Sequence, residues 1–332
     1  MKKLIIISLA LLALLTSCNL DNQGIFAEVI DRTPPDDRKL SVIGLSSSDP
    51  NILYFSSVNG IESYDLVNNT YETLDDSENA RKISISLMVE GKIVYGVTRA
   101  TQDIVEYTGF YLCDPDGTHK KLNCENEVIF NGSFENFAYD AVGNIYKAEL
   151  DPDNLKLTFS KIPVPEEGLS FYDNMDRIFC FMKGSTFTYY LFDGTNLIKI
   201  PELDGAGKIR SVAKDTDSSI IAVFSSDNAS TVYKITGTSA VKLKGTAVGS
   251  KISKNFASFI YDGYLYYTFD KSSTVYRMEL ATGNTSTDTI SKISNVSIVG
   301  YYSYAEGEYR ICTSNNGFFK LKINSDHSVT IN

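Results

Sequence analysis

Phe318-Phe319-Lys320-Leu321-Lys322-Ile323, followed by a polar turn and then by Val329-Thr330-Ile331, is the stretch that decides the fold. Aromatic and β-branched residues dominate both segments, and such residues are enriched in β-strands. Two short strands on either side of a few polar residues predict a β-hairpin. The hairpin therefore serves as a template against which the rest of the chain can be compared.

The same unit recurs along the chain. Seven copies, the third of them irregular, are Ile61–Leu66 with Tyr71–Leu74, Gly109–Asp114 with Lys120–Leu122, Ile145–Leu150 with Leu157–Phe159, Tyr189–Asp193 with Leu197–Ile200, Val232–Thr236 with Val241–Leu243, Val275–Leu280 with Thr287–Ile290, and Phe318–Ile323 with Val329–Ile331. Their turns open 37 to 49 residues apart, at Asp65, Asp114, Asp151, Asp193, Thr236, Ala281 and Asn324.

A period of about 40–50 residues with four short strands per repeat is typical of a β-propeller blade. Further strand candidates precede the hairpins, at Ile52–Phe55, Lys92–Val97, Ile220–Phe224 and Tyr264–Phe269. One four-stranded sheet cannot bury both of its faces, but several sheets packed in a ring can. We therefore predict an all-β fold, a seven-bladed β-propeller over residues 40–332, with six or eight blades as alternatives.

The repeat resembles propeller proteins in its period and hairpin pattern, without the marks of one family. The chain has no Trp, so the WD dipeptide is missing, and the Gly-Gly pairs of kelch blades are missing too. The ring has two predicted ways to close. Either the first and last blades only pack together, or the apolar patch Ile25–Ile30 pairs with one of them.

The amino-terminal segment has the pattern of a secretory signal. Lys2 and Lys3 precede an apolar run of 12 residues, Leu4–Leu15, and small residues follow it. A membrane-spanning helix needs about 18 apolar residues, so this run is too short to span. The ending Leu15-Thr16-Ser17-Cys18 resembles the lipobox of bacterial lipoproteins.

That resemblance implies that a signal peptidase cuts before Cys18 and that Cys18 carries the lipid. We expect a signal peptide at 1–17, a lipidated tether at 18–39 and a protein anchored in the cell envelope through lipid alone. Asn19 stands where Asp resembles a retention signal for the inner membrane, which favours the outer membrane. The propeller lipoprotein of the outer-membrane barrel-assembly machinery is similar in anchoring and architecture, although its repeats usually close with Gly and Trp.

The charge argues against one class of function, and the cysteine positions argue against disulfides. The formal net charge is −10, which argues against nucleic-acid binding because that binding depends on Lys and Arg at phosphates. Cys113 and Cys124 flank one hairpin, with Cys113 expected opposite Lys120, so the two sulfurs are out of register for a disulfide. Cys180 and Cys312 lie in apolar strands and are expected to be buried thiols.

Few residues suit catalysis or metal binding. His119 and His327 are the only histidines, and both fall in hairpin turns expected at the rim of the propeller. Acidic turns at 114–117, 151–154 and 215–218 match turn chemistry better than a calcium site. The carboxylate pairs Glu125/Glu127, Glu166/Glu167 and Asp173/Asp176 are available for glycoside cleavage, but chance proximity explains them better. We expect no catalytic residue, no metal and no cofactor.

Tyrosine supplies the one candidate binding site. Of 21 tyrosines, Tyr301, Tyr302 and Tyr304 lie early in the last blade, where the inner strand borders the central channel. Tyrosine is favoured in binding surfaces, although most of the tyrosines are expected to fill space between blades. We therefore expect a monomeric, non-catalytic binding or scaffold protein whose partner is an envelope protein or a glycan. The alternatives are a propeller enzyme acting on polysaccharide through channel carboxylates and a membrane-protein assembly factor.

The lipobox hypothesis predicts that Cys18→Ala abolishes incorporation of a palmitate analogue and moves the protein from the membrane to the soluble fraction. The reason is that no other segment of the chain is predicted to hold it on a membrane. Labelling that persists in the Cys18→Ala variant would contradict the lipobox assignment.

Overall fold

The computed structural model describes residues 40–331, apart from residues 78, 98–108, 115–117, 126–127, 164–165, 167–168, 216, 227–229, 244–253, 294 and 315–316. The predicted signal peptide, Cys18 and the patch Ile25–Ile30 lie outside the described residues. No helix within the described part of the chain has the length and apolar character needed to cross a membrane.

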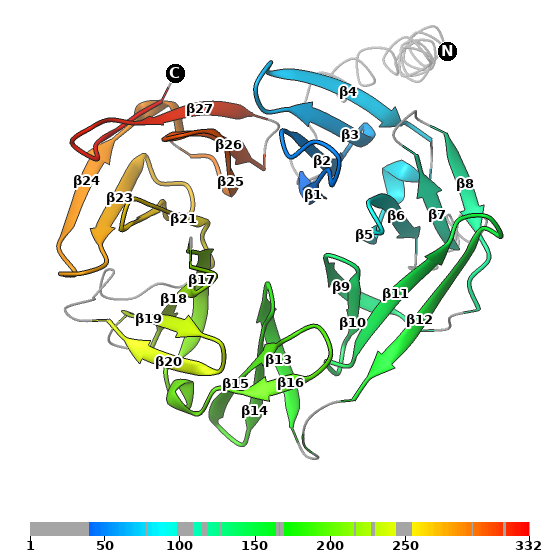
Figure 1. The fold of residues 1–332 in the computed structure, drawn as a ribbon, viewed down its shortest axis with the longest axis horizontal. Coiled ribbons are helices and arrows are strands. Elements are labelled where there is room, and N and C mark those ends of the chain that lie inside the picture. Colours follow the sequence, from blue (N-terminus) through cyan, green and yellow to red (C-terminus); the bar gives the residue numbers. More distant parts are fainter. Residues whose placement is uncertain are drawn as a thin grey trace, which may run out of the picture. The chain divides into compact units, whose positions relative to one another are not determined.

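Seven four-stranded antiparallel sheets form a ring, and each sheet takes its four strands consecutively from the chain (Figure 1). Blade 1 contains β1 (Ser41–Leu45), β2 (Ile52–Ser57), β3 (Gly60–Asp65) and β4 (Thr70–Asp75). Blade 2 contains β5 (Ile85–Val89), β6 (Lys92–Val97), β7 (Gly109–Cys113) and β8 (His119–Leu122). Blade 3 contains β9 (Phe130–Phe134), β10 (Phe137–Asp140), β11 (Ile145–Asp151) and β12 (Lys156–Ile162).

Blades 4 to 7 follow the same order. Blade 4 contains β13 (Ser170–Met175), β14 (Ile178–Lys183), β15 (Thr186–Phe192) and β16 (Leu197–Lys199). Blade 5 contains β17 (Lys208–Lys214), β18 (Ile220–Ser225), β19 (Ser230–Thr236) and β20 (Ser239–Lys242). Blade 6 contains β21 (Ser258–Tyr261), β22 (Tyr264–Tyr267), β23 (Thr274–Glu279) and β24 (Thr285–Thr289), and blade 7 contains β25 (Ile298–Ala305), β26 (Glu308–Thr313), β27 (Phe318–Ile323) and β28 (Val329–Ile331). Short 3₁₀ turns at Ala80–Lys82, Pro201–Leu203 and Ser291–Ile293 join blades.

The first strand of every blade lies nearest the ring axis and the fourth lies at the rim (Figure 1). The seven-bladed prediction is confirmed, including the irregular third copy, which is the hairpin of β11 and β12. Connections from the first to the second strand and from the third to the fourth lie on one face of the ring. The connections between blades lie on the other face, which we call the mouth face because the inner strands begin there.

The hydrophobic core is divided among the seams between blades. The buried apolar side chains of the described residues form seven clusters, and each cluster joins two neighbouring blades. The central strands supply most of these side chains. In β14, for example, the run from Ile178 to Phe181 is buried throughout. A strand packed on both faces needs such a continuous apolar run, which explains why these strands lack alternation.

In the described part of the chain, blades 1 and 7 are joined by side-chain packing. Neither blade takes a strand from the other, because each consists of four consecutive strands. The rings of Tyr64 and Phe318 stack with centroids 3.8 Å apart. Arg310 is 8% exposed, and its Nε donates a hydrogen bond to the Leu66 carbonyl at 2.7 Å while Nη2 reaches the Val67 carbonyl at 3.3 Å. The alternative closure through Ile25–Ile30 falls outside the described residues and stays a prediction.

Substitution of Arg310 by Ala should lower the free energy of unfolding by about 3 kcal/mol. Two hydrogen bonds from a charged donor are lost and two partly buried carbonyl groups lose their partner. Unfolding in guanidinium chloride measures the change, with Lys322→Ala, an exposed position on the neighbouring strand β27, as the control. Equal stability of the two variants would show that Arg310 does not hold the seam.

Candidate functional site

Five of the seven inner strands carry a β-bulge near the mouth face. In β1, β9, β13, β17 and β25 the register with the second strand shifts by one residue. The residues at the shift have at least intermediate exposure and form what we call the mouth ring: Ile43, Asn131, Tyr172, Arg210 and Val299. A bulge frees one residue from the ladder and redirects its side chain. The repeated bulge therefore leaves residues such as Tyr172, Arg210 and Val299 outside the regular ladder at this face, whereas Ile43 still packs against the cluster that joins blades 1 and 2.

A glycine or serine follows four of the five bulges and allows close packing behind the mouth ring. Gly300 is the clearest case, because a Cβ at this position would lie 2.7 Å from the hydroxyl of Tyr302. Gly132 faces the hydroxyl of Tyr139 in the same way in blade 3. The glycines thus let tyrosine side chains lie across the inner strands.

A hollow of about 420 Å³ lies between the inner strands of blades 4 to 7, and most of its lining residues are at the mouth-face ends of β21 and β25. Its wall is formed by Met175 at the end of β13, Val212 on β17, the segment 255–258 that leads into β21, and the segment 298–302 of β25. The lining side chains are mostly apolar or aromatic. Pockets of about 300–1,000 Å³ with such walls are typical of ligand sites.

The structure brings two of the three predicted tyrosines together in this hollow. Tyr301 and Tyr302 both line it. The hydroxyl groups of Tyr301 and Thr268 are 3.0 Å apart and hydrogen-bonded, and the Tyr301 ring packs on Phe259 with centroids 4.7 Å apart. Burial raises the pKa of both Tyr301 and Tyr302 above the usual value. The two phenols therefore stay neutral at physiological pH.

Tyr304 lies elsewhere and does not line the hollow. Its ring is 5.0 Å from the Arg310 guanidinium and 5.7 Å from Lys320 Nζ. Tyr304 also packs against the cluster that joins blades 1 and 7. Tyr302 packs against the same cluster, so both residues lie at the closing seam, and of the two Tyr302 also lines the hollow.

Two basic residues at the mouth were not anticipated from the sequence. Lys208 Nζ lies 4.9 Å from the centre of the Tyr172 ring. Arg210 belongs to the mouth ring, and its Nη1 is 3.4 Å from Oδ1 of Asn255, which lines the hollow. The two basic residues at 208 and 210, at the start of a blade, are the sequence signal that would have found them.

The histidines lie at outer strands. His119 begins β8, with Nδ1 3.5 Å from Asp75 Oδ1, and His327 lies in the turn between β27 and β28, where it stacks on Tyr264. Within the described ranges no three His, Cys, Asp or Glu side chains are placed to hold a metal ion.

In the described acidic turns, the carboxylates accept hydrogen bonds from nearby backbone and side-chain donors. The Asp151 carboxylate accepts hydrogen bonds from the backbone N–H and the side-chain amide of Asn154, which hold its pKa below the usual value. Asp217 binds Lys234 and the Ser219 N–H. Asp176 lies 3.5 Å from Lys214. Of the candidate acids, Asp116, Glu127 and Glu167 lie outside the described residues.

All four cysteines in the described chain are thiols. The register of the β7–β8 hairpin differs by one residue from the prediction, because Cys113 faces His119 and Leu112 faces Lys120. Five residues, 114–118, therefore separate the two paired positions, one fewer than the predicted pairing of Cys113 with Lys120 implies. Cys180 and Cys312 are buried as predicted.

Comparisons with known proteins support the fold and no particular family. No family model matches the chain, and no curated protein matches it. Among solved structures, the Dos1 propeller matches with a TM-score of 0.53 and 11% identity over 89% of this chain and 84% of that one. Virginiamycin B lyase from Staphylococcus aureus matches with a TM-score of 0.51 and 13% identity over 87% of this chain and 100% of that one.

A third match is YCF48 bound to a D1 peptide, with a TM-score of 0.52 and 9% identity over 84% of this chain and 92% of that one. The three proteins have different names. At these identities the likeness establishes that the chain has the β-propeller fold.

The buried thiols should react slowly with iodoacetamide in the native protein. Burial raises the pKa of Cys180 to about 11 and that of Cys312 to about 12, so at pH 8 only about one Cys180 thiol in a thousand is ionised. Cys124 is partly exposed and should be modified first, as peptide mass spectrometry can show. Urea should expose all four, whereas native labelling of Cys312 as fast as Cys124 would contradict its burial.

Proposed function

We propose that this chain is a lipid-anchored binding protein of the bacterial cell envelope, and that its propeller holds a segment of a partner protein in the hollow at the channel mouth. The observation that carries the proposal is the hollow itself, with its wall of apolar and aromatic side chains from four consecutive blades. The lipobox pattern at Cys18 supports the envelope location.

The chemistry of the wall suits protein binding. Aromatic side chains and Met are enriched at the centres of protein interfaces, and Met adapts to ligands of irregular shape. The Tyr301 ring is fixed by Phe259 and by the hydrogen bond to Thr268. A rigid aromatic wall loses little side-chain entropy when a partner binds, which favours affinity.

The same wall does not suit hydrolysis of a polysaccharide. Glycoside cleavage commonly uses two carboxyl groups, and the described residues that line the hollow include no carboxylate, histidine or cysteine. Tyr301 and Tyr302 are the titratable groups of the wall, and burial raises the pKa of each. Neither phenol is therefore suited to act as a general base near neutral pH.

The assembly-factor alternative is a special case of the same proposal, in which the partner is a membrane protein under assembly. The match to YCF48 bound to a D1 peptide supplies no evidence for it, because that likeness is one of fold. Deletion that leaves the levels of outer-membrane proteins unchanged would rule out the assembly role and leave the binding role open.

The binding proposal predicts that Val299→Arg removes the partner. Val299 lines the hollow and is 37% exposed, so a long charged side chain there blocks the site without disturbing the core. Pull-down from detergent-solubilised envelope should recover a partner with the wild type and at least about tenfold less with the variant. Val142→Arg, on an exposed turn of blade 3 where Val142 is 63% exposed, is the matched control.

Two outcomes would contradict the proposal. One is the absence of any partner above background with the wild-type protein. The other is equal recovery by wild type, Val299→Arg and Val142→Arg, which would show that a partner binds away from the hollow.

A further inference from the structure

The wall of the hollow continues along β17 into two basic residues. In this strand Ile209, Ser211 and Ala213 are buried, whereas Lys208, Arg210 and Val212 are only partly buried. The bulge at Arg210 interrupts the alternation of this strand, so that Val212 packs against the cluster joining blades 4 and 5 while Arg210 reaches Asn255, which leads into blade 6. Arg210 adjoins the hollow through Asn255, which lines it, and Lys208 shares a small pocket with Arg210 at the mouth-face end of the strand.

Arg210 is tied directly to residues of the hollow. Its carbonyl accepts a hydrogen bond from the Phe256 N–H at 3.0 Å, and its Nη1 lies 3.4 Å from Asn255 Oδ1. The Nε group of Arg210 is buried and has no hydrogen-bond partner among the described residues. One long contact to a neutral amide leaves most of the donors of this guanidinium available.

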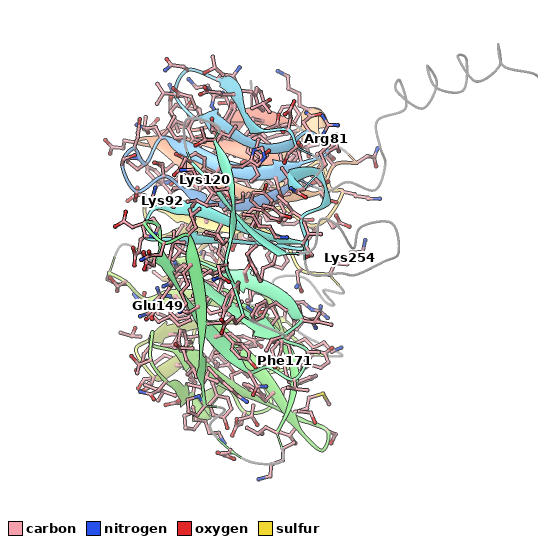
Figure 2. The ribbon with its side chains drawn as sticks, turned by 90° about the vertical axis from the view of Figure 1, so that its right-hand side faces the viewer. Arg81, Lys92, Lys120, Glu149, Phe171 and Lys254 are labelled. Atoms are coloured by element: carbon pink, nitrogen blue, oxygen red, sulfur yellow. The ribbon has the colours of Figure 1, made fainter. Side chains whose placement is uncertain are left out.

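Lys208 and Arg210 also lack the carboxylate partners that other basic residues of the protein have. In the described part of the chain neither forms an ion pair within 4 Å. Lys254 shows the contrast, because it precedes β21 on the mouth face and lies 2.6 Å from Asp270. Figure 2, a side view of the ring, places Lys254 toward the face opposite Lys92 and Glu149.

One acidic residue lies near the pair. Asp173 shares with Lys208, Arg210, Tyr172 and Cys180 the lining of a small pocket of about 30 Å³, which has room for a single water molecule. It offsets one of the two positive charges. Among the described residues that line this small pocket, one excess positive charge therefore remains, in a protein whose formal net charge is −10.

We propose that Arg210 and Lys208 bind a carboxylate of the partner segment while the hollow takes an adjacent apolar side chain. This inference rests on the proposed function. An arginine fork matches a carboxylate with two parallel hydrogen bonds. Arg210 and Val212 stand about 7 Å apart along the strand, so an extended peptide places the carboxylate within about two residues of the apolar side chain. The carboxylate comes either from an internal acidic residue or from a peptide carboxyl terminus.

Because the chain contains no Trp, binding of a Trp-containing peptide can be followed by its Trp fluorescence without any Trp signal from the protein. Three probes separate the possibilities: acetyl-Gly-Asp-Trp-Leu-Gly-amide, acetyl-Gly-Asn-Trp-Leu-Gly-amide, and the Asn peptide with a free carboxyl terminus. Each is titrated by Trp fluorescence against the full-length protein in mild detergent at low salt.

We expect an acidic probe to bind at least about tenfold more tightly than the neutral amide, and added salt to reduce the difference. Whichever acidic probe binds more tightly identifies the source of the carboxylate. Arg210→Gln should abolish the preference while leaving the neutral peptide within about twofold of its wild-type affinity. Arg210→Lys should restore part of the preference, and thermal unfolding of each variant verifies that it is folded.

Lys214→Gln is the matched control. Lys214 ends the same strand at the opposite face and pairs with Asp176, so its loss should not change the preference. Equal binding of acidic and neutral probes, or a preference that survives in Arg210→Gln, overturns the carboxylate inference but not the proposed function. Failure of every probe to bind also overturns it, and the Val299→Arg pull-down then decides separately whether the proposed function holds.

Discussion

The seam between blades 7 and 1 is the contact on which the rest of the structure depends. Every blade of the described chain is complete in itself, so the sheets supply no hydrogen-bonded ladder across this seam. Arg310 bridges it to two carbonyl groups, and Tyr64 and Phe318 stack across it. Since each blade buries its faces only against its neighbours, an open seam would leave two apolar faces in water, at a cost proportional to their area.

The candidate site is a product of this closed ring. The hollow draws its wall from blades 4, 5, 6 and 7, and no single blade contains it. The site also depends on the β-bulges, because they remove Arg210 and Val299 from the hydrogen-bonded ladder of their strands at the mouth face. The spacing of blades around the axis sets the width of the hollow, and the bulges set which side chains a partner meets first.

The sequence was sufficient for the fold because the signal is periodic. Seven hairpins at similar spacing remain recognisable even where one copy, Ile145–Leu150 with its partner, is irregular. Tyr301 and Tyr302, expected at the channel from their position at the start of the last blade, line the hollow, and their role in binding stays a prediction. Tyr304 was grouped with them because sequence spacing does not reveal that Arg310 and Lys320, from neighbouring strands, surround its ring. Arg210 was missed because its role depends on a bulge and on Asn255, 45 residues away.

The division of the core into seven seams also determines how the ring responds to force. The described chain begins at Leu40, a residue buried in the closing seam, so tension applied to the amino-terminal end is delivered there first. If blade 1 parted from blade 7, an arc of seven blades with six intact interfaces would remain. The seam that closes this ring is therefore also the contact next to the amino-terminal end of the described chain, where a tether would apply its force.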